Sequence, residues 1–230
     1  MNVFENIPVL YINLDYRTDR NEHIQKELGK LGISEPIRER FNAIKMPNGA
    51  VGCTMSHIKC LEFAKSRNWS QVMICEDDAV FSQPDVLISS INKFTESNIV
   101  WDVLLIGANN VPPYDKIGDY CIRVSNAQTT TCYMVSSHYY DTLIRNFREG
   151  VAKLLRDPTN KREWAIDIYW KRLQGIDRWY MLTPPTVYQK EDYSDIEGRT
   201  VDYRHLMLDL DKPWLFQRSL NNKKMNMPYI

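Results

Sequence analysis

Short apolar runs of strand length alternate with segments of helical periodicity, and this alternation constrains the fold more than any other feature of the sequence. Strand-like runs occupy residues 7–14, 72–75, 102–106, 120–124, 129–135 and 178–183. Amphipathic helical segments occupy about 19–32, 54–67, 84–94, 140–147 and 163–174. Strands separated by helices of this length predict an α/β fold, with a mostly parallel central sheet flanked by helices. Such sheets bind ligands at the carboxyl ends of their strands.

Within this pattern we expect a capping box from Asp19 and Glu22 at the start of the first helix. Gly49 and Gly52 stand before the second helix, and residues 108–119 read as a loop. The part from Pro184 onward is polar and predicts mostly loops. Asn221-Asn222-Lys223-Lys224, near the end, has the composition of a disordered segment.

The size and charge of the chain exclude several functional classes. Its 230 residues suit a single domain, numbered 1–230. Lysine plus arginine (29) equals aspartate plus glutamate (29), so no overall field favours nucleic acid or an acidic membrane. The first residues do not resemble a signal peptide, and no apolar run approaches the ~18 residues that span a bilayer. We therefore expect a soluble, cytoplasmic protein with no membrane span and no nucleic-acid partner.

The five cysteines are an odd number without a Cys-x-x-Cys pair, which argues against a disulfide framework and favours a reducing compartment. Cys75, Cys121 and Cys132 lie in apolar runs typical of a core. Cys53, His57 and Cys60 are spaced to share one helical face, a pattern that can bind zinc. The pattern lacks a fourth ligand, so zinc is the weaker interpretation.

Three adjacent acids, Glu76-Asp77-Asp78, follow directly after a buried strand. Their charges repel one another and are costly to bury, and a divalent cation relieves both penalties. Residues i and i+2 of an extended segment point the same way, so Glu76 and Asp78 are expected to hold one ion. Oxygen ligands favour Mg²⁺ or Mn²⁺. A solvated acidic turn, or a cap for the next helix, is the alternative.

Four segments taken together resemble glycosyltransferase family 25, the family of lipooligosaccharide-biosynthesis and collagen galactosyltransferases. They are residues 11–20 (YINLDYRTDR), 51–57 (VGCTMSH), 74–79 (ICEDDA) and 101–107 (WDVLLIG). The resemblance covers about residues 8–107 and extends more faintly to Gln189. It implies a GT-A-like fold, a UDP-sugar donor, a divalent metal (usually Mn²⁺) and inversion at the anomeric carbon. Residues 8–107 would then form the nucleotide-sugar and metal-binding half, 108–205 the acceptor side, and 206–230 a partly flexible extension.

Donor-binding candidates follow the first strand and the acidic motif. Asn13 is expected to bind the uracil, with Asp15 beside it, and Arg17 to pair with the diphosphate through a guanidinium fork. Arg20 carries less weight, because an exposed helix face explains it equally well. Asp77 is expected to contact the ribose or the donor sugar. The family resemblance adds His57 and Gln189 near the donor.

The general base must be a carboxylate or histidine near the acceptor hydroxyl. Asp167 is the first candidate, since it lies beside Ile166 on an otherwise apolar helix face. The family often has a proline-x-aspartate element here, and this chain lacks the proline. Asp102 is the second candidate, although it also begins a strand.

Two other functions remain open at this point. A nucleotidyltransferase acting on a sugar phosphate combines a similar sheet, acids and a metal, but it usually has a glycine-rich loop after the first strand. Residues 14–18 contain no glycine. A catalytically inactive nucleotide- or carbohydrate-binding module is the third possibility. The acceptor (glycan, protein or lipid-linked), the transferred sugar and the oligomeric state are not specified by these motifs.

Overall fold

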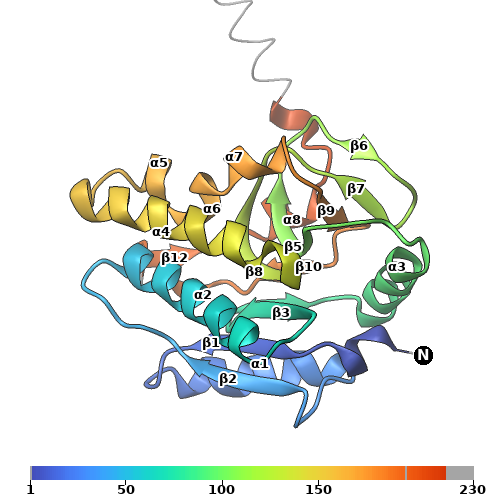
Figure 1. Cartoon of the computed structure of the whole chain (residues 1–230), viewed down its shortest axis with the longest axis horizontal. Coiled ribbons are helices and arrows are strands. Elements are labelled where there is room, and N and C mark those ends of the chain that lie inside the picture. The colour runs from blue at the N-terminus through green and yellow to red at the C-terminus, as the bar shows by residue number, and fades with distance from the viewer. Residues whose placement is uncertain (1, 195, 216–230) are drawn as a thin grey trace, which may run out of the picture.

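An eight-stranded sheet forms the centre of the molecule, with helices packed on both faces (Figure 1). The computed structural model describes residues 2–194 and 196–215. The strand order is β2-β1-β3-β8-β5-β9-β7-β6. The strands are β1 Val9–Asn13, β2 Arg38–Asn42, β3 Gln71–Glu76, β5 Val103–Asn110, β6 Asp115–Lys116, β7 Cys121–Arg123, β8 Ala127–Ser136 and β9 Trp179–Leu182.

The sheet is mixed, so the expected α/β class with flanking helices is confirmed but the mostly parallel strand direction is wrong. β1 runs parallel to β2 and β3, and β5 runs parallel to β9. β8 lies antiparallel between β3 and β5, and β7 is antiparallel to β9. No helix separates β5 from β8 along the chain, and parallel neighbours need a long crossover. The short links between β5 and β8 permit the reversed direction.

Side chains of the central strands point alternately to the two faces of the sheet and pack into two apolar cores. On one face, Leu10, Ile74 and Leu105 pack in a cluster with α2 (Gly49–Ser66) and α4 (Tyr140–Arg156). On the other face, their neighbours pack with α1 (Thr18–Lys30) and α3 (Pro84–Glu96). Because successive strand residues point to opposite faces, nearly continuous apolar strands are what a sheet covered on both faces requires.

The helix starts differ from the sequence expectations in two places. α1 has Arg17 at its N-cap and no side-chain cap, so the Asp19–Glu22 capping box is not formed. α2 begins at Gly49, with Asn48 accepting a hydrogen bond from the Ala50 N–H as its cap. Gly52 therefore lies inside the helix. A Cβ there would come within 2.4 Å of the Ile44 carbonyl oxygen, so glycine lets the preceding loop pack against α2.

The C-terminal part contains more regular structure than expected. Three short helices replace the single one expected over 163–174: α5 (Lys161–Trp164), α6 (Ile166–Tyr169) and α7 (Lys171–Gln174). β10 (Val187–Gln189) pairs antiparallel with β4 (Ala79–Phe81). β11 (Asp192–Ser194) and β12 (Arg199–Val201) form a hairpin, and α8 (Arg204–Leu208) follows. Residues 221–224 and most of the expected extension lie outside the described residues.

All five cysteines are free thiols, and four of them are buried. In the described ranges, no helix has the length and apolar character needed to cross a membrane.

Candidate active site

A cavity of about 750 Å³ opens where the central strands of the sheet end. The carboxyl ends of β1, β3 and β5 and the start of the antiparallel β8 meet there. The N-terminal turn of α2, the helix α6 and the β11–β12 hairpin complete its walls. The cavity thus lies where the strand-end rule places a ligand site.

Glu76 ends β3 and is held by donors from three other elements. Its carboxylate accepts hydrogen bonds from Thr130 Oγ1 (2.6 Å), from Gln189 Nε2 (3.2 Å) and from His57 Nε2 (3.3 Å). Burial alone would raise the pKa of Glu76, but the hydrogen bonds from His57, Thr130 and Gln189 outweigh it and lower this pKa. Glu76 is therefore an ionised carboxylate in a fixed orientation.

His57 orients Glu76 from α2. Its ring is 1% exposed, and Nδ1 lies 2.8 Å from the hydroxyl of Tyr133. In the neutral tautomer that donates from Nε2 to Glu76, Nδ1 accepts from Tyr133. Cys53 Sγ lies 3.9 Å from Glu76 Oε1, so one ligand atom from each of Cys53, His57 and Glu76 falls within 4.8 Å of the others. Cys60, the third residue of the zinc pattern that the sequence made the weaker interpretation, is buried in the apolar core and is not part of this group.

Asp77 points away from Glu76, toward the end of β1. It accepts hydrogen bonds from Asn13 Nδ2 (2.7 Å) and Arg20 Nη1 (3.1 Å). Burial raises the pKa of Asp77, while Arg20 and Asn13 oppose that rise. Asn13 is itself 1% exposed and also binds the Arg17 carbonyl and Arg40. Asn13 is not among the residues that line the cavity, and it positions Asp77; its binding to uracil stays a prediction.

Asp78 is the least satisfied acid of the three. Among the described residues its buried Oδ1 has no hydrogen-bond partner, and Oδ2 lies 3.5 Å from Arg20 Nη1. Burial, with the nearby charge of Glu76, raises the pKa of Asp78 to about 8. A buried, unpaired carboxylate oxygen facing a cavity is the feature that a bound cation would relieve.

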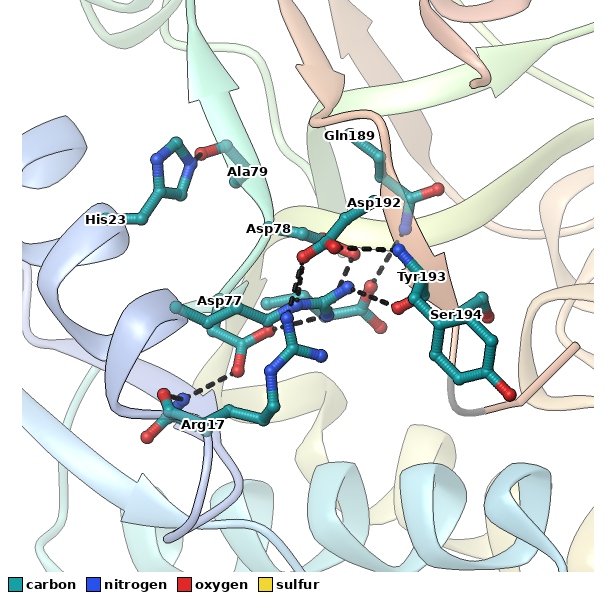
Figure 2. A network of polar contacts seen from close by, with 12 residues as sticks. Arg17, His23, Asp77, Asp78, Ala79, Gln189, Asp192, Tyr193 and Ser194 are labelled. Carbon is teal, nitrogen blue, oxygen red and sulfur yellow. Dashed lines mark hydrogen bonds and ion pairs between the residues drawn. The ribbon is translucent and has the colours of Figure 1, made fainter. Parts of the chain in front are cut away.

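Arg17 and Arg20, at the start of α1, both bind Asp192 of the β11–β12 hairpin, and Arg20 also binds the acidic turn. Figure 2 shows Arg17 between Asp77 and Asp192. Asp192 Oδ2 accepts from Arg17 Nη2 at 2.7 Å and from Arg20 Nε at 3.0 Å. Arg17 also pairs with Asp19, and Arg20 Nη2 donates to the Tyr193 carbonyl. Burial opposes the charge of Arg20, but Asp78 and Asp77 outweigh it and raise its pKa. Two guanidinium groups, each paired with carboxylates, therefore lie beside the acidic turn of the cavity.

Sequence reasoning undervalued Arg20 and missed Asp192. Arg20 lies four residues before Ile24, the first member of the buried stripe of α1, so helical periodicity already placed it on the inward face. Asp192 carries no comparable signal. It reaches the site because β10 pairs with β4 next to the acidic turn, where the Lys190 N–H donates to the Asp78 carbonyl at 2.7 Å.

Asp167, at the start of α6, lines the same cavity. Its Oδ2 accepts a hydrogen bond from the Thr129 N–H at 3.1 Å. Burial raises the pKa of Asp167, the Thr129 hydrogen bond opposes this, and the charge of Glu76 adds to the rise. A carboxylate with a raised pKa accepts a proton more readily near neutral pH.

Two expected site residues lie elsewhere. Asp102 precedes β5, at the opposite end of that strand from the cavity, and it binds Arg178 and His138, each at 2.6 Å. Burial would raise the pKa of Asp102, but these contacts outweigh it and lower this pKa. Asp15 is exposed and pairs with Arg40 at 2.9 Å. Neither lines the cavity: the buried carboxylate of Asp102 forms an ion pair with Arg178 and Asp15 forms a surface ion pair, and the catalytic role of Asp102 and the donor role of Asp15 stay predictions without support from this geometry.

Comparison with known proteins agrees with this picture. Residues 35–109 match the model of Glycosyltransferase family 25 (LPS biosynthesis protein). The match spans three of the four segments that carry the sequence resemblance, including the acidic turn. No curated protein matches the chain.

Solved structures with similar folds are distant. Mannose-1-phosphate geranyltransferase from Thermus thermophilus is 9% identical, with a TM-score of 0.47 over 76% of this chain and 73% of that one. A glycosyltransferase involved in glycosylation of the major capsid of PBCV-1 is 10% identical, with a TM-score of 0.40 over 77% and 92%. A mutant of Drosophila β1,4-galactosyltransferase 7 in complex with manganese, UDP-Gal and xylobiose is 11% identical, with a TM-score of 0.37 over 96% and 79%.

Similarity at this level says nothing of activity, donor or metal, and the family match rests on the sequence. Over residues 35–109, which contain the acidic turn and its flanking strands, the chain is similar to glycosyltransferase family 25.

Proposed function

We propose that this protein transfers a sugar from a UDP-sugar to an acceptor hydroxyl, with a divalent cation at the acidic turn and inversion at the anomeric carbon. One observation carries the proposal. Asp78, whose buried Oδ1 is unpaired, lines the same cavity as Arg17 and Arg20. Guanidinium groups bind a diphosphate, and a carboxylate with an unpaired oxygen binds a divalent cation. The two kinds of group side by side therefore suit a ligand that contains both a metal ion and a diphosphate.

The residues present fit Mn²⁺ or Mg²⁺. Asp78 offers an unpaired oxygen, and Glu76 is an ionised carboxylate two residues earlier on the same turn. Both are hard oxygen ligands that leave further positions for phosphate oxygens and water. When bound, such an ion neutralises charge on the leaving diphosphate.

The other residues bind and orient the donor. Arg17 and Arg20 offer guanidinium groups to the diphosphate oxygens, in the place that Asp192 takes in this structure. His57 and Gln189 act indirectly, since both hold Glu76 in its rotamer. Asp77 is fixed by Asn13 and Arg20 at the cavity wall, where it remains a candidate partner for the ribose or the donor sugar.

Asp167 is the proposed general base. It lines the cavity on the side formed by β8 and α6, separated along β8 from Glu76 by the contacts of Thr129 and Thr130. A carboxylate on that side would take the proton of an acceptor hydroxyl that attacks the donor sugar opposite the diphosphate. A single displacement of this kind inverts the anomeric carbon.

A thermal-shift screen of UDP, GDP, CMP and ADP, each with and without Mn²⁺, tests the donor and the metal together. We expect UDP to raise Tm only when Mn²⁺ is present, and Asp78→Ala to abolish that rise. Stabilisation by another nucleotide without Mn²⁺ contradicts the proposal. A nucleotidyltransferase would instead release pyrophosphate when given a nucleoside triphosphate and a sugar phosphate, and we expect no such release.

A further inference from the structure

Two side chains that line the cavity each have a buried polar atom with no partner within the described residues. Asn109, near the end of β5, is 6% exposed and its Oδ1 is unpaired. Thr129, near the start of β8, is partly buried and its Oγ1 is unpaired. Both residues line the cavity. Because an unpaired buried polar group is costly, two of them on residues that line one cavity indicate a ligand with hydrogen-bonding groups at that place.

The backbone is shaped to present these two side chains. The pairing of β5 with β8 shifts register twice, between Leu105 and Gly107 and between Gly107 and Asn109. A Cβ on Gly107 would lie 2.6 Å from Val187 Cγ1, so glycine allows this irregular segment to pack under β10. Register shifts of this kind re-aim side chains and are frequent next to active sites.

Thr129 also has an unusual backbone conformation. Its φ is +72°, a left-handed value that a β-branched residue rarely adopts. This conformation directs the Thr129 N–H to Asp167 and leaves the side-chain hydroxyl at the cavity wall. Strain of this type persists where surrounding structure maintains it, most often at ligand sites.

We propose that Asn109 and Thr129 form a subsite for the hydroxyl groups of a carbohydrate acceptor. The inference rests on the proposed function and names its acceptor class. Contacts along β8 give the order: Thr130 binds Glu76, Thr129 binds Asp167, and Gln128 pairs with Asn109. The subsite thus lies beside the candidate base and on the side away from the metal motif. Two neutral groups, a carboxamide and a hydroxyl, suit sugar hydroxyls, which both donate and accept hydrogen bonds.

Binding of simple sugars tests this subsite without knowledge of the natural acceptor. Methyl glycosides of glucose, galactose, mannose, N-acetylglucosamine and xylose are titrated into the full chain with UDP and Mn²⁺, and binding is followed by saturation-transfer NMR. We expect at least one glycoside to bind. Asn109→Leu and Thr129→Val should each weaken that binding about tenfold, as loss of one hydrogen bond predicts.

Asn110→Leu is the matched control. Asn110 is the next residue of β5, is 1% exposed, and has an unpaired carboxamide in the described structure, yet it does not line the cavity. This variant should bind the glycoside like wild type. All three variants remove a buried polar group without a partner, so none is expected to lower Tm. Differences in glycoside binding among the three variants then reflect the site and not a loss of folded protein.

Three outcomes overturn the subsite: no glycoside binds, Asn109→Leu and Thr129→Val bind like wild type, or Asn110→Leu loses binding equally. Titration of UDP and of UDP-sugars in the same samples separates this failure from failure of the proposed function. Variants that weaken UDP-sugar binding relative to UDP would place the donor sugar at this subsite and contradict the acceptor assignment. If the wild type does not bind UDP with Mn²⁺, that result would instead contradict the proposed function itself.

Discussion

Arg20 holds more of the candidate site together than any other single side chain among the described residues. It contacts Asp77, Asp78, Asp192 and the Tyr193 carbonyl, and its side chain is only 13% exposed. Its charge therefore offsets three carboxylates that belong to two segments about 115 residues apart along the chain. Any anion that enters the cavity competes with these acids for the same guanidinium.

Replacement of Arg20 by alanine should affect stability and binding together. We expect a loss of about 2 kcal/mol in unfolding free energy, because partly buried acids lose their counter-charge. We also expect weaker UDP–Mn²⁺ binding, measured by calorimetry. Arg148→Ala is the control, since Arg148 is 64% exposed and forms a surface ion pair with Glu62, so its loss should change stability by under about 0.5 kcal/mol. Equal behaviour of the two variants would contradict the role of Arg20.

The candidate base gives a separate kinetic prediction. Asp167→Asn should lower kcat by about 10²–10⁴-fold and leave donor affinity unchanged, since general bases contribute that much to rate. Asp102→Asn is the matched comparison, because it removes a buried carboxylate that does not line the cavity. That variant should lose stability through its broken Arg178 pair but keep kcat. A full rate in Asp167→Asn would remove Asp167 as the base.

At the scale of the elements, α2 forms both a core helix and a wall of the cavity. Its packing against the loop before it depends on the missing side chain of Gly52, 2.4 Å from the Ile44 oxygen when a Cβ is added. Gly52→Ala should therefore cost about 1–3 kcal/mol in chemical denaturation, because backbone must move. Gly29→Ala in α1, where a Cβ meets nothing within 4 Å, should stabilise by about 0.5–1 kcal/mol. A Gly52→Ala variant as stable as wild type would contradict the close approach.

Element positions followed well from periodicity, and their relative directions did not. The apolar runs at 72–75 and 178–183 correspond to β3 and β9, and the stripe around Tyr140 to α4. The reversed direction of β8 is set by short connections and by pairing between distant strands. Local sequence patterns carry neither of these, so a mostly parallel sheet was expected where a mixed one forms.

On the scale of the whole molecule, the site assembles from segments that sequence order keeps far apart. Glu76, Asp78 and Arg17 could be inferred because each follows the end of an apolar strand, where open sheets bind ligands. Asp192, Asn109 and Thr129 could not. Asp192 lies on the β11–β12 hairpin near the end of the described chain. Asn109 follows a register shift in β5, and Thr129 has a left-handed backbone conformation. The contacts of Asn13 and Asp102 could not be predicted either, because their partners, Asp77 and Arg178, come from other elements.

The acidic turn also makes the pH dependence of stability measurable without metal. Burial raises the pKa of Asp78 to about 8, above its ordinary value of 3.8. Between these two values the folded state binds a proton that the unfolded state has released, so stability falls as pH rises from about 4 to about 8 and changes little above that. Asp78→Asn removes this titration. The variant should therefore match wild type near pH 4 and exceed it by about 1–3 kcal/mol at pH 8.5 in EDTA.

Asp78→Asn also tests whether the buried charge of Asp78, which lowers stability at high pH, is needed to bind Mn²⁺ and UDP. Excess Mn²⁺ with UDP should raise the Tm of the wild type at pH 8.5 and leave that of Asp78→Asn unchanged, because the variant lacks the charged ligand. Asp119→Asn is a suitable control: Asp119 is exposed, and its pKa is lowered by Lys93 instead of raised. The decline in stability from about pH 4 to about pH 8 should therefore persist in Asp119→Asn, because the titration of Asp78 is intact there. Asp77 and Asp167, whose pKa values burial also raises, leave a smaller decline in Asp78→Asn. A decline in Asp78→Asn as large as that of the wild type would contradict the assignment to Asp78.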